Sequence, residues 1–552
     1  MVCPAITIAA IASGAGKTTL ALAIARALTL RGLRVQTFKV GPDFLDPTHL
    51  ALATGRPCYN LDSWMCGKDY VRERYASKTI DADVAIIEGV MGLYDGASPD
   101  SIEGSTAEIA KLLDAPILLT VNVRGMARSL AALVQGACSF EPGLPFRGVL
   151  ANHCGSDRHA DILRQALQSA NLPPLLGSIP TGAFPELASR HLGLVAATPE
   201  SLQTLDAYAA IAEQHLHAVL DGVKAGGERA EGRGKERGER VERGTWEGWR
   251  REDRGARATL APERILHRAI EDQNILDPRP SSLSLAIAHD AAFSFYYPDT
   301  LEALAATGLQ LVPFSPISDT ALPENIQGIY FGGGYPELHA PVLSANTAML
   351  AAIRDFAQRG GFIYAECGGM MYLSESIETL EGVTFPMTGL LPFGTRMTPK
   401  RKVLGYVEVT LQQDTLWGQK GDTCRGHEFH YSDIIPVHHL GTPGSSLAQE
   451  QTTGKPAESP QPTPPSPTPA RLEASPWKLD IPCSSLDIEF PPSLAPRPSP
   501  LPPSYLCSYR GNRAPRPGGF RCGNVLADYI HLHWASHPTA IHTFTQTIGA
   551  KS

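Results

Sequence analysis

The sequence predicts an α/β protein that contains two parallel-sheet domains. Short apolar runs alternate with helical patterns in residues 1–222 and again in residues 281–436. Such alternation is typical of parallel strands that are covered by helices on both faces. The chain has 552 residues, which is too long for a single hydrophobic core. We therefore expect two separately packed α/β domains.

Two segments have the composition of solvated chain. Residues 223–280 begin with a run of Gly, Glu and Arg, which predicts a charged low-complexity linker. Acidic residues alternate with the arginines there, which argues against a nucleic-acid site. Residues 437–503 are rich in Pro, Ser and Thr, and we expect a disordered insertion. Ordered patterns resume in residues 504–552, so the last part of the second domain should come from the C-terminus.

Charge and cysteine content exclude several classes of protein. The formal net charge of −8 argues against a general nucleic-acid binder. The ten cysteines include no CxxC pair, which favours reduced thiols in the cytoplasm over disulfides or a zinc ribbon. We find no signal peptide and no apolar run long enough to span a membrane. The sequence does not determine the oligomeric state, and a homodimer is compatible with it.

A phosphate-binding loop is predicted between the apolar strand at residues 5–10 and the helical run at residues 20–30. Small residues let main-chain N–H groups converge on phosphate oxygens, and the helix N-terminus adds positive potential. Lys17 would reach the terminal phosphates of ATP, and Thr18 would bind Mg²⁺. Ile11 replaces the first glycine of the usual pattern, and a simple glycine-rich turn is the alternative. The ATP-binding candidates are Ser13, Gly14, Ala15, Gly16, Lys17, Thr18 and Thr19.

Carboxylates near two other predicted strands could complete a magnesium site. Glu88 directly follows the apolar run 84–87 and is the first choice, because a metal ligand belongs at the end of a strand beside a phosphate loop. Asp43 is the second choice. Asp46 and Asp95 either ligate the metal directly or organise turns, and both are also candidates for contact with the substrate.

Basic side chains in loops are candidates for holding an anionic substrate, although solvation at the surface is the usual role of a single arginine. Asn152 follows another apolar run and could contact a nucleotide base. The substrate-binding candidates are Lys39, Asp46, Asp95, Arg124, Arg128, Arg190 and His191.

A nucleophilic cysteine is predicted in the second domain. The apolar run 362–365 leads to Cys367, two glycines follow, and a helical pattern then begins. A strand, a sharp turn and a helix in this order expose the side chain at the turn and orient nearby N–H groups toward it. A buried free thiol is the alternative reading. Candidate oxyanion donors are Gly333, Gly334 and Gly368, although three successive glycines also suit a flexible turn.

Seven motifs together resemble the cobyrinic acid a,c-diamide synthase family. They are SGAGKT (13–18), GPDFLD (41–46), EGVMGLYDG (88–96), RHLGL (190–194), GGGYPE (332–337), GHEFHYS (426–432) and YIHLH (529–533). The resemblance implies an N-terminal P-loop ATPase domain similar to dethiobiotin synthase. It also implies a C-terminal class I glutamine amidotransferase domain with a flavodoxin-like fold.

The resemblance implies a chemistry and its participants. ATP would activate a carboxylate as an acyl phosphate, and Cys367 would release ammonia from L-glutamine with His531 as general base. Amidotransferases of this class usually have an acidic residue two positions after that histidine, whereas this chain has His533. The acceptor would be cobyrinic or hydrogenobyrinic acid. Alternatives are a cobyric acid synthase, a nickel-tetrapyrrole amidase, or a nucleotide-switch ATPase with a non-catalytic amidotransferase-like domain.

Overall fold

The computed structural model describes residues 3–187, 189–190, 193–194, 196–223, 283–435, 503–509, 514–537 and 539–550. The predictions of a charged linker at 223–280 and of a disordered insertion at 437–503 lie almost wholly outside these residues. So does the candidate His191.

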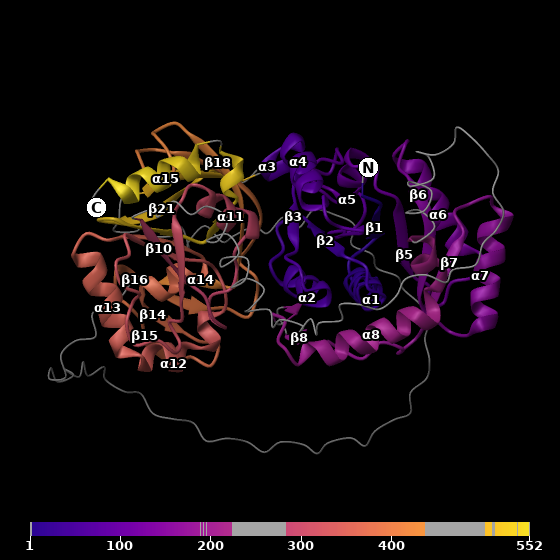
Figure 1. Cartoon of the computed structure of the whole chain (residues 1–552), viewed down its shortest axis with the longest axis horizontal. Helices are drawn as coiled ribbons and strands as arrows, with labels where there is room; N and C mark the ends of the chain where they lie inside the picture. The colour runs from indigo at the N-terminus through magenta and orange to yellow at the C-terminus, as the bar shows by residue number, and fades with distance from the viewer. Residues whose placement is uncertain are drawn as a thin grey trace, which may run out of the picture. The chain divides into compact units, whose positions relative to one another are not determined.

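The first domain is built on a seven-stranded parallel sheet with the order β3-β2-β4-β1-β5-β6-β7 (Figure 1). Its strands are β1 (Ala5–Ala10), β2 (Val35–Val40), β3 (Tyr59–Leu61), β4 (Val84–Glu88), β5 (Ile117–Asn122), β6 (Phe146–Cys154) and β7 (Leu175–Pro180). The apolar runs at 5–10, 84–87, 117–121 and 148–151 lie within four of them. The parallel-sheet prediction for this domain is therefore confirmed.

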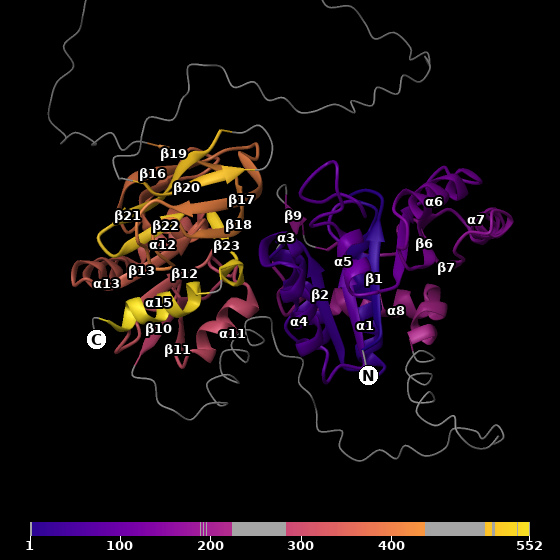
Figure 2. The same ribbon diagram turned by 90° about the horizontal axis from the view of Figure 1, so that it is seen from above.

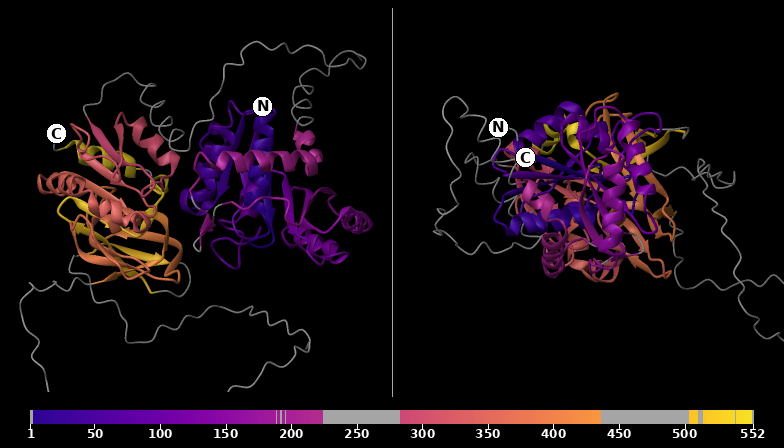
Figure 3. Two further views of the ribbon diagram at one scale, coloured as in Figure 1. Left: turned by 90° about the horizontal axis from the view of Figure 1, so that it is seen from below. Right: turned by 90° about the vertical axis from the view of Figure 1, so that its right-hand side faces the viewer.

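Helices cover both faces of this sheet. One core contains apolar residues of α1 (Lys17–Leu30), α2 (Leu45–Thr54) and α8 (Ser201–His215). Figure 3 shows α8 running across this face of the domain. Helices α4 (Lys68–Lys78), α5 (Thr106–Leu112), α6 (Ser129–Phe140) and α7 (Asp157–Ser169) contribute to the cores on the opposite face. The domain also contains α3 (Ser63–Cys66) and a small ribbon of β8 (Ser189–Arg190) and β9 (Gly193–Leu194).

The second domain contains a ten-stranded sheet, whose parallel half is flavodoxin-like as predicted (Figure 2). This half has the order β11-β10-β12-β13-β22, which is the doubly wound order 2-1-3-4-5. The strands are β10 (Ser284–Ala288), β11 (Gln310–Phe314), β12 (Gly328–Phe331), β13 (Phe362–Glu366) and β22 (Val525–Asp528). Helices α12 (Ala340–Ala345) and α13 (Thr347–Gln358) pack on one face, and α11 (Pro298–Ala306) and α15 (Ala540–Gly549) pack on the other.

Antiparallel strands extend this sheet beyond β22. They follow in the order β21-β20-β17-β18-β23 and comprise β17 (Val403–Leu411), β18 (Thr423–His430), β20 (Pro503–Tyr509), β21 (Arg516–Cys522) and β23 (Ile530–Leu532). A separate four-stranded sheet contains β14 (Ser374–Glu378), β15 (Thr384–Pro386), β16 (Leu391–Met397) and β19 (Ser432–Ile435). The sequence patterns did not predict this extension. It places the histidine-bearing strands β18 and β23 side by side.

The described residues form one compact unit, and polar contacts join its two domains. The Tyr70 hydroxyl donates to Asp299 at 2.6 Å, and Arg74 donates to Glu302 at 2.9 Å. The Tyr406 hydroxyl donates to Asp62 at 2.7 Å. No helix in the described part of the chain has the length and apolar character that a membrane crossing requires.

Candidate functional site

The predicted phosphate loop lies between β1 and α1. Gly14 and Gly16 have φ angles of 76° and 99°, a region that favours glycine. Lys17 begins α1, and its ammonium group donates to the main-chain oxygens of Ala12 and Met91. Burial and the nearby Lys39 ammonium lower the pKa of Lys17. The loop thus has the backbone shape and the cation that phosphate binding requires.

Asn152 supports the loop from β6. Its amide nitrogen donates to the Ala15 oxygen at 3.0 Å, and its amide oxygen accepts from the His153 N–H at 3.0 Å. A Cβ on Gly16 would lie 2.3 Å from the same amide nitrogen. Both ends of the amide therefore have main-chain partners. Asn152 therefore supports the loop, and its contact with a nucleotide base stays a prediction.

Three oxygen-bearing side chains meet next to the loop. The Thr18 hydroxyl donates to Glu88 at 2.5 Å and lies 3.4 Å from Asp46. The Lys39 ammonium, on β2, lies 2.6 Å from Asp46 and 2.8 Å from Glu88. Glu88 is fully buried at the end of β4, where the sequence placed it. Parallel strands and the loop before α1 bring these groups to one sheet edge.

The pKa values in this cluster follow from burial and from the lysine. Burial and the Asp46 carboxylate raise the pKa of Glu88 to about 8, while Lys39 acts in the opposite direction. Burial would also raise the pKa of Asp46, but Lys39 lowers it. Asp46 is therefore the main ionic partner of Lys39. One oxygen of Glu88, Oε2, is buried without a hydrogen-bond partner in the described residues.

These groups suit Mg²⁺, which prefers carboxylate and hydroxyl oxygens. The orphaned Oε2 belongs to the carboxylate whose Oε1 accepts from Thr18, and Thr18 also lies near Asp46. The described residues contain no group of three His, Cys, Asp or Glu side chains able to hold a metal. A magnesium site here would therefore combine two carboxylates with the Thr18 hydroxyl and phosphate oxygens.

Several predicted residues have other surroundings. Asp43, the second choice for the metal, accepts from the N–H groups of Leu45 and Asp46 and so begins α2. Asp95 accepts from the Gly92 N–H at 2.9 Å, which is the turn-forming alternative. Asp46 lies with Thr18 and Glu88, as the metal-ligand alternative requires, and its contact with substrate stays a prediction.

The basic candidates whose side chains the structure describes have different surroundings. Lys39 is buried between two carboxylates, whereas Arg124 and Arg128 are exposed in the loop after β5. Arg190 lies on β8, and its side chain is outside the described parts. The role of these residues in substrate binding stays a prediction.

Cys367 lies at a sharp turn between β13 and α14 (Gly368–Leu373). Its φ of 46° is rare for a residue with a side chain, and such strain is typical of a nucleophile turn, although this thiol is buried at 7% exposure. Its N–H donates to the Asp528 oxygen at 2.7 Å, and the thiol lies 3.7 Å from the Phe429 oxygen. Burial, with a contribution from Glu337, raises the pKa of the Cys367 thiol. A base is therefore needed to form the thiolate.

His531 is buried on β23 among rings and glycines. Its ring stacks on His427 with centroids 5.0 Å apart, and Phe44 lies at the same distance. A Cβ on Gly333 would be 2.3 Å from its Cε1 atom. Burial, together with His531, lowers the pKa of His427 well below its usual range, so His427 acts as a neutral packing partner.

The glycine turn after β12 connects this base with the cysteine. Gly333 packs against His531, and a Cβ on Gly368 would lie 2.9 Å from the Gly334 nitrogen. The three predicted oxyanion residues therefore lie around Cys367 and His531. Backbone can approach this closely only because these positions have no side chains.

Glu428, for which the sequence suggested no role, joins side chains of three strands, β18, β20 and β21. It accepts from Arg516 at 2.7 Å and from the Tyr509 hydroxyl, and it pairs with His430 at 2.9 Å. Burial alone would raise its pKa, but His430 and Arg516 hold the pKa of Glu428 at about 2. This network fixes the antiparallel strands next to Cys367.

We expect Glu428→Gln to remove a pH-dependent part of the stability. The folded-state pKa of about 2 is below the usual 4.5, so this carboxylate stabilises the protein above pH 4.5 and loses that effect as pH falls toward 2. The shift corresponds to roughly 3 kcal/mol. Denaturation midpoints of wild type and variant should differ most near pH 7, and by pH 3 the difference should fall to less than about half. Glu408→Gln, which removes a half-exposed pair with Arg425, is the matched control and should change little. An equal difference at both pH values would contradict the linkage.

A cavity of about 1150 Å³ extends from the nucleotide loop to the base. Its wall includes Lys17, Thr18 and Asp46 at one end, and His427 and His531 at the other. Phe44 also lines it and stacks on Phe295 with centroids 5.2 Å apart. One cavity is thus bordered by the candidate nucleotide site and by the candidate base His531.

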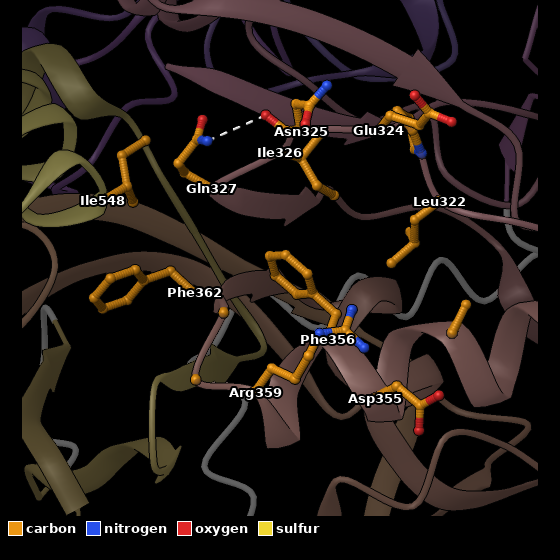
Figure 4. A pocket seen from close by; sticks show the side chains of 14 residues that line it. Leu322, Glu324, Asn325, Ile326, Gln327, Asp355, Phe356, Arg359, Phe362 and Ile548 are labelled. Carbon is orange, nitrogen blue, oxygen red and sulfur yellow. Dashed lines mark hydrogen bonds between the residues drawn. The ribbon is translucent and has the colours of Figure 1, made fainter. Parts of the chain in front are cut away.

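A second cavity of about 790 Å³ lies at the other edge of the amidotransferase sheet (Figure 4). Phe362, at the start of β13, lines it together with Arg359, Phe356 and Ile548. Cys367 follows the opposite end of β13. The lining contains no cysteine or histidine, so this cavity is not the thiol site.

Comparisons with known proteins agree with this geometry. The family model "CobQ/CobB/MinD/ParA nucleotide binding domain" matches residues 6–195, and "CobB/CobQ-like glutamine amidotransferase domain" matches residues 284–456. The cobyrinate a,c-diamide synthase of Syntrophotalea carbinolica is 42% identical, covering 99% of this chain and 98% of the relative.

Two further relatives have similar names. The cobyrinate a,c-diamide synthase of Leptospira interrogans is 36% identical over 99% of this chain and 98% of its own. The hydrogenobyrinate a,c-diamide synthase of Streptomyces coelicolor is 38% identical over 78% of this chain and 87% of its own. These matches confirm the resemblance drawn from the seven motifs. The chain belongs to the cobyrinate a,c-diamide synthase family.

Proposed function

We propose that this protein amidates the a and c carboxylates of cobyrinic or hydrogenobyrinic acid, using ATP and ammonia from glutamine, in cobalamin biosynthesis. The names of its relatives indicate this substrate class. The observation that carries the proposal is the single cavity bordered by Lys17 of the nucleotide loop and by His531. An enzyme that makes ammonia at one centre and uses it at another needs such a connection.

The ATPase step belongs to the first domain, residues 1–222. A carboxylate is a poor electrophile, so ATP phosphorylates the acceptor carboxyl to give an acyl phosphate. Lys17 binds the transferred phosphate, and the glycine loop orients it. Thr18, Glu88 and Asp46 would hold Mg²⁺, which neutralises phosphate charge.

The glutaminase step belongs to residues 281–436 and 504–552. His531 takes the thiol proton as the Cys367 sulfur attacks the amide carbon, and N–H groups around Gly334 and Gly368 stabilise the oxyanion. The carbon–nitrogen bond breaks, the nitrogen takes the proton from His531, and ammonia leaves. Water then hydrolyses the thioester to glutamate. Ammonia crosses the shared cavity and displaces phosphate from the acyl phosphate.

The direct test is a product assay with the full chain. Purified protein receives ATP, Mg²⁺, glutamine and either cobyrinic or hydrogenobyrinic acid, and the product is weighed by mass spectrometry. We expect a diamide together with ADP, phosphate and glutamate. Comparison of the two acceptors identifies the preferred ring. Amidation of other carboxylates would instead indicate a cobyric acid synthase, and no amide product would contradict the proposal.

A further inference from the structure

The base His531 lacks the usual acidic partner two positions later. His533 occupies that position, and its Nε2 atom lies 3.3 Å from Asp299. Its ring also packs against Tyr297, with centroids 4.6 Å apart. Burial would raise the pKa of Asp299, but His533 and Arg74 hold it below its usual range. His533 is therefore part of a different ion pair and does not orient His531.

Glu366 is the acidic residue that lies next to the Nδ1 atom of His531. It is the last residue of β13, directly before Cys367, and it is 1% exposed. Its Oε2 atom lies 3.7 Å from His531 Nδ1. That Nδ1 atom is buried and has no hydrogen-bond partner in the described residues. In the described parts of the chain, Glu366 is the only carboxylate within ion-pair distance of His531.

Three donors hold the Glu366 carboxylate in place. The Tyr364 hydroxyl donates to Oε1 at 2.7 Å, and the Tyr330 hydroxyl donates to Oε2 at 3.1 Å. The Leu532 N–H donates to Oε1 at 3.2 Å. Leu532 follows His531, so this last bond ties the strand that carries the base to the strand that carries the nucleophile.

Neighbouring carboxylates are already used elsewhere. Asp528 is paired with Glu366 in the β13–β22 register, but its oxygens accept from Gly519 and Tyr529 N–H groups. Glu428 is bound by Arg516 and His430. Neither has an ion-pair contact with His531 within the described chain. Glu366 on β13 thus takes the place of the acid that usually lies two positions after the histidine.

We propose that Glu366 is the positioning residue for His531, an inference that rests on the proposed glutaminase step. The carboxylate accepts the Nδ1–H of His531, which leaves the Nε2 lone pair for the Cys367 proton. As the thiol proton moves to Nε2, the carboxylate stabilises the imidazolium. The proton then passes to the departing nitrogen. Closure of the 3.7 Å gap to hydrogen-bond distance accompanies glutamine binding, as catalytic bonds often shorten in the complex.

The test compares glutaminase and ammonia-driven activity in Glu366→Gln. The amide keeps the shape but offers no charge to the imidazolium. We expect kcat for glutamine hydrolysis to fall at least about 100-fold, because the analogous loss in Ser-His-Asp enzymes is larger still. The KM for glutamine and amidation with added ammonia should stay within about threefold of wild type. Glu366→Asp keeps the charge and should recover part of kcat.

A matched variant separates positioning from support of the fold. Tyr364→Phe removes a donor to the same carboxylate but keeps the carboxylate, so we expect less than a tenfold loss of kcat. An equal loss in Tyr364→Phe and Glu366→Gln, or unchanged kcat in Glu366→Gln, overturns the inference.

A measurement that leaves Glu366 unchanged covers the case in which Glu366→Gln does not fold. With glutamine bound to Cys367→Ala, nitrogen-15 NMR of labelled histidine should show one ring N–H proton far downfield that disappears in the His531→Gln double variant. Absence of that resonance overturns the role of Glu366. Absence of any glutaminase activity in wild type would instead overturn the proposed function itself.

Discussion

Cys367→Ala should abolish glutamine-driven amidation while amidation with added ammonium salt continues. The nucleophile is lost, so kcat with glutamine should fall at least about 1000-fold, as when triad members are removed from hydrolases. The ATPase domain, with Lys17 and Glu88, is unchanged by this substitution. Parallel assays with glutamine and with ammonia, each read by amide product, measure the two outcomes.

Cys522→Ala is the matched control, because Cys522 is an exposed free thiol on β21 of the same domain. It should retain both activities. A diazoketone analogue of glutamine should label wild type and Cys522→Ala but not Cys367→Ala. Equal loss of glutamine- and ammonia-driven amidation in Cys367→Ala, with the fold intact by circular dichroism, would contradict separate reaction centres.

The α/β architecture could be predicted because parallel strands are buried on both faces. Their sequences contain continuous apolar runs, such as residues 84–87, that stand out from polar surroundings. The antiparallel strands could not be found in this way. Residues such as Thr423–His430 mix polar and apolar side chains, and their partners come from distant parts of the chain. Pairing between residues 426 and 532 leaves no local signal.

The choice between Asp43 and Asp46 shows a second limit. Both carboxylates lie in one short loop, and spacing does not say which one faces the phosphate loop. The start of α2 decides which carboxylate lies next to the phosphate loop. Asp43 accepts the free N–H groups there, while Asp46 points toward Thr18 and Lys39. The same limit applies to Lys39, which the sequence suggests as a substrate ligand. Its sequence context does not reveal that it lies between two buried carboxylates.

Glu366 was missed because it ends a buried strand. Its neighbours Tyr364 and Ala365 are core residues, and only the folded chain brings His531 to its carboxylate. A buried glutamate directly before a candidate nucleophile was the available signal, since an acidic side chain in a strand core needs partners. The acid of related amidotransferases is expected two positions after the histidine, and not on β13 before the cysteine.

Lys17→Ala should have the opposite signature to Cys367→Ala, with loss of amidation from both nitrogen sources and retention of glutamine hydrolysis. The ammonium group is anchored on the Ala12 and Met91 oxygens at the loop, where it would meet the transferred phosphate. Removing one preorganised cation of this kind typically lowers kcat by about 100-fold or more. Release of ADP and of glutamate, measured in the same reaction, separates the two steps.

Lys111→Ala, which removes a half-exposed pair with Glu141 in the same domain, is the control and should retain both. If Lys17→Ala kept ammonia-driven amidation, ATP would have to be used elsewhere, and the cavity between this loop and His531 would have no role in joining the two reactions.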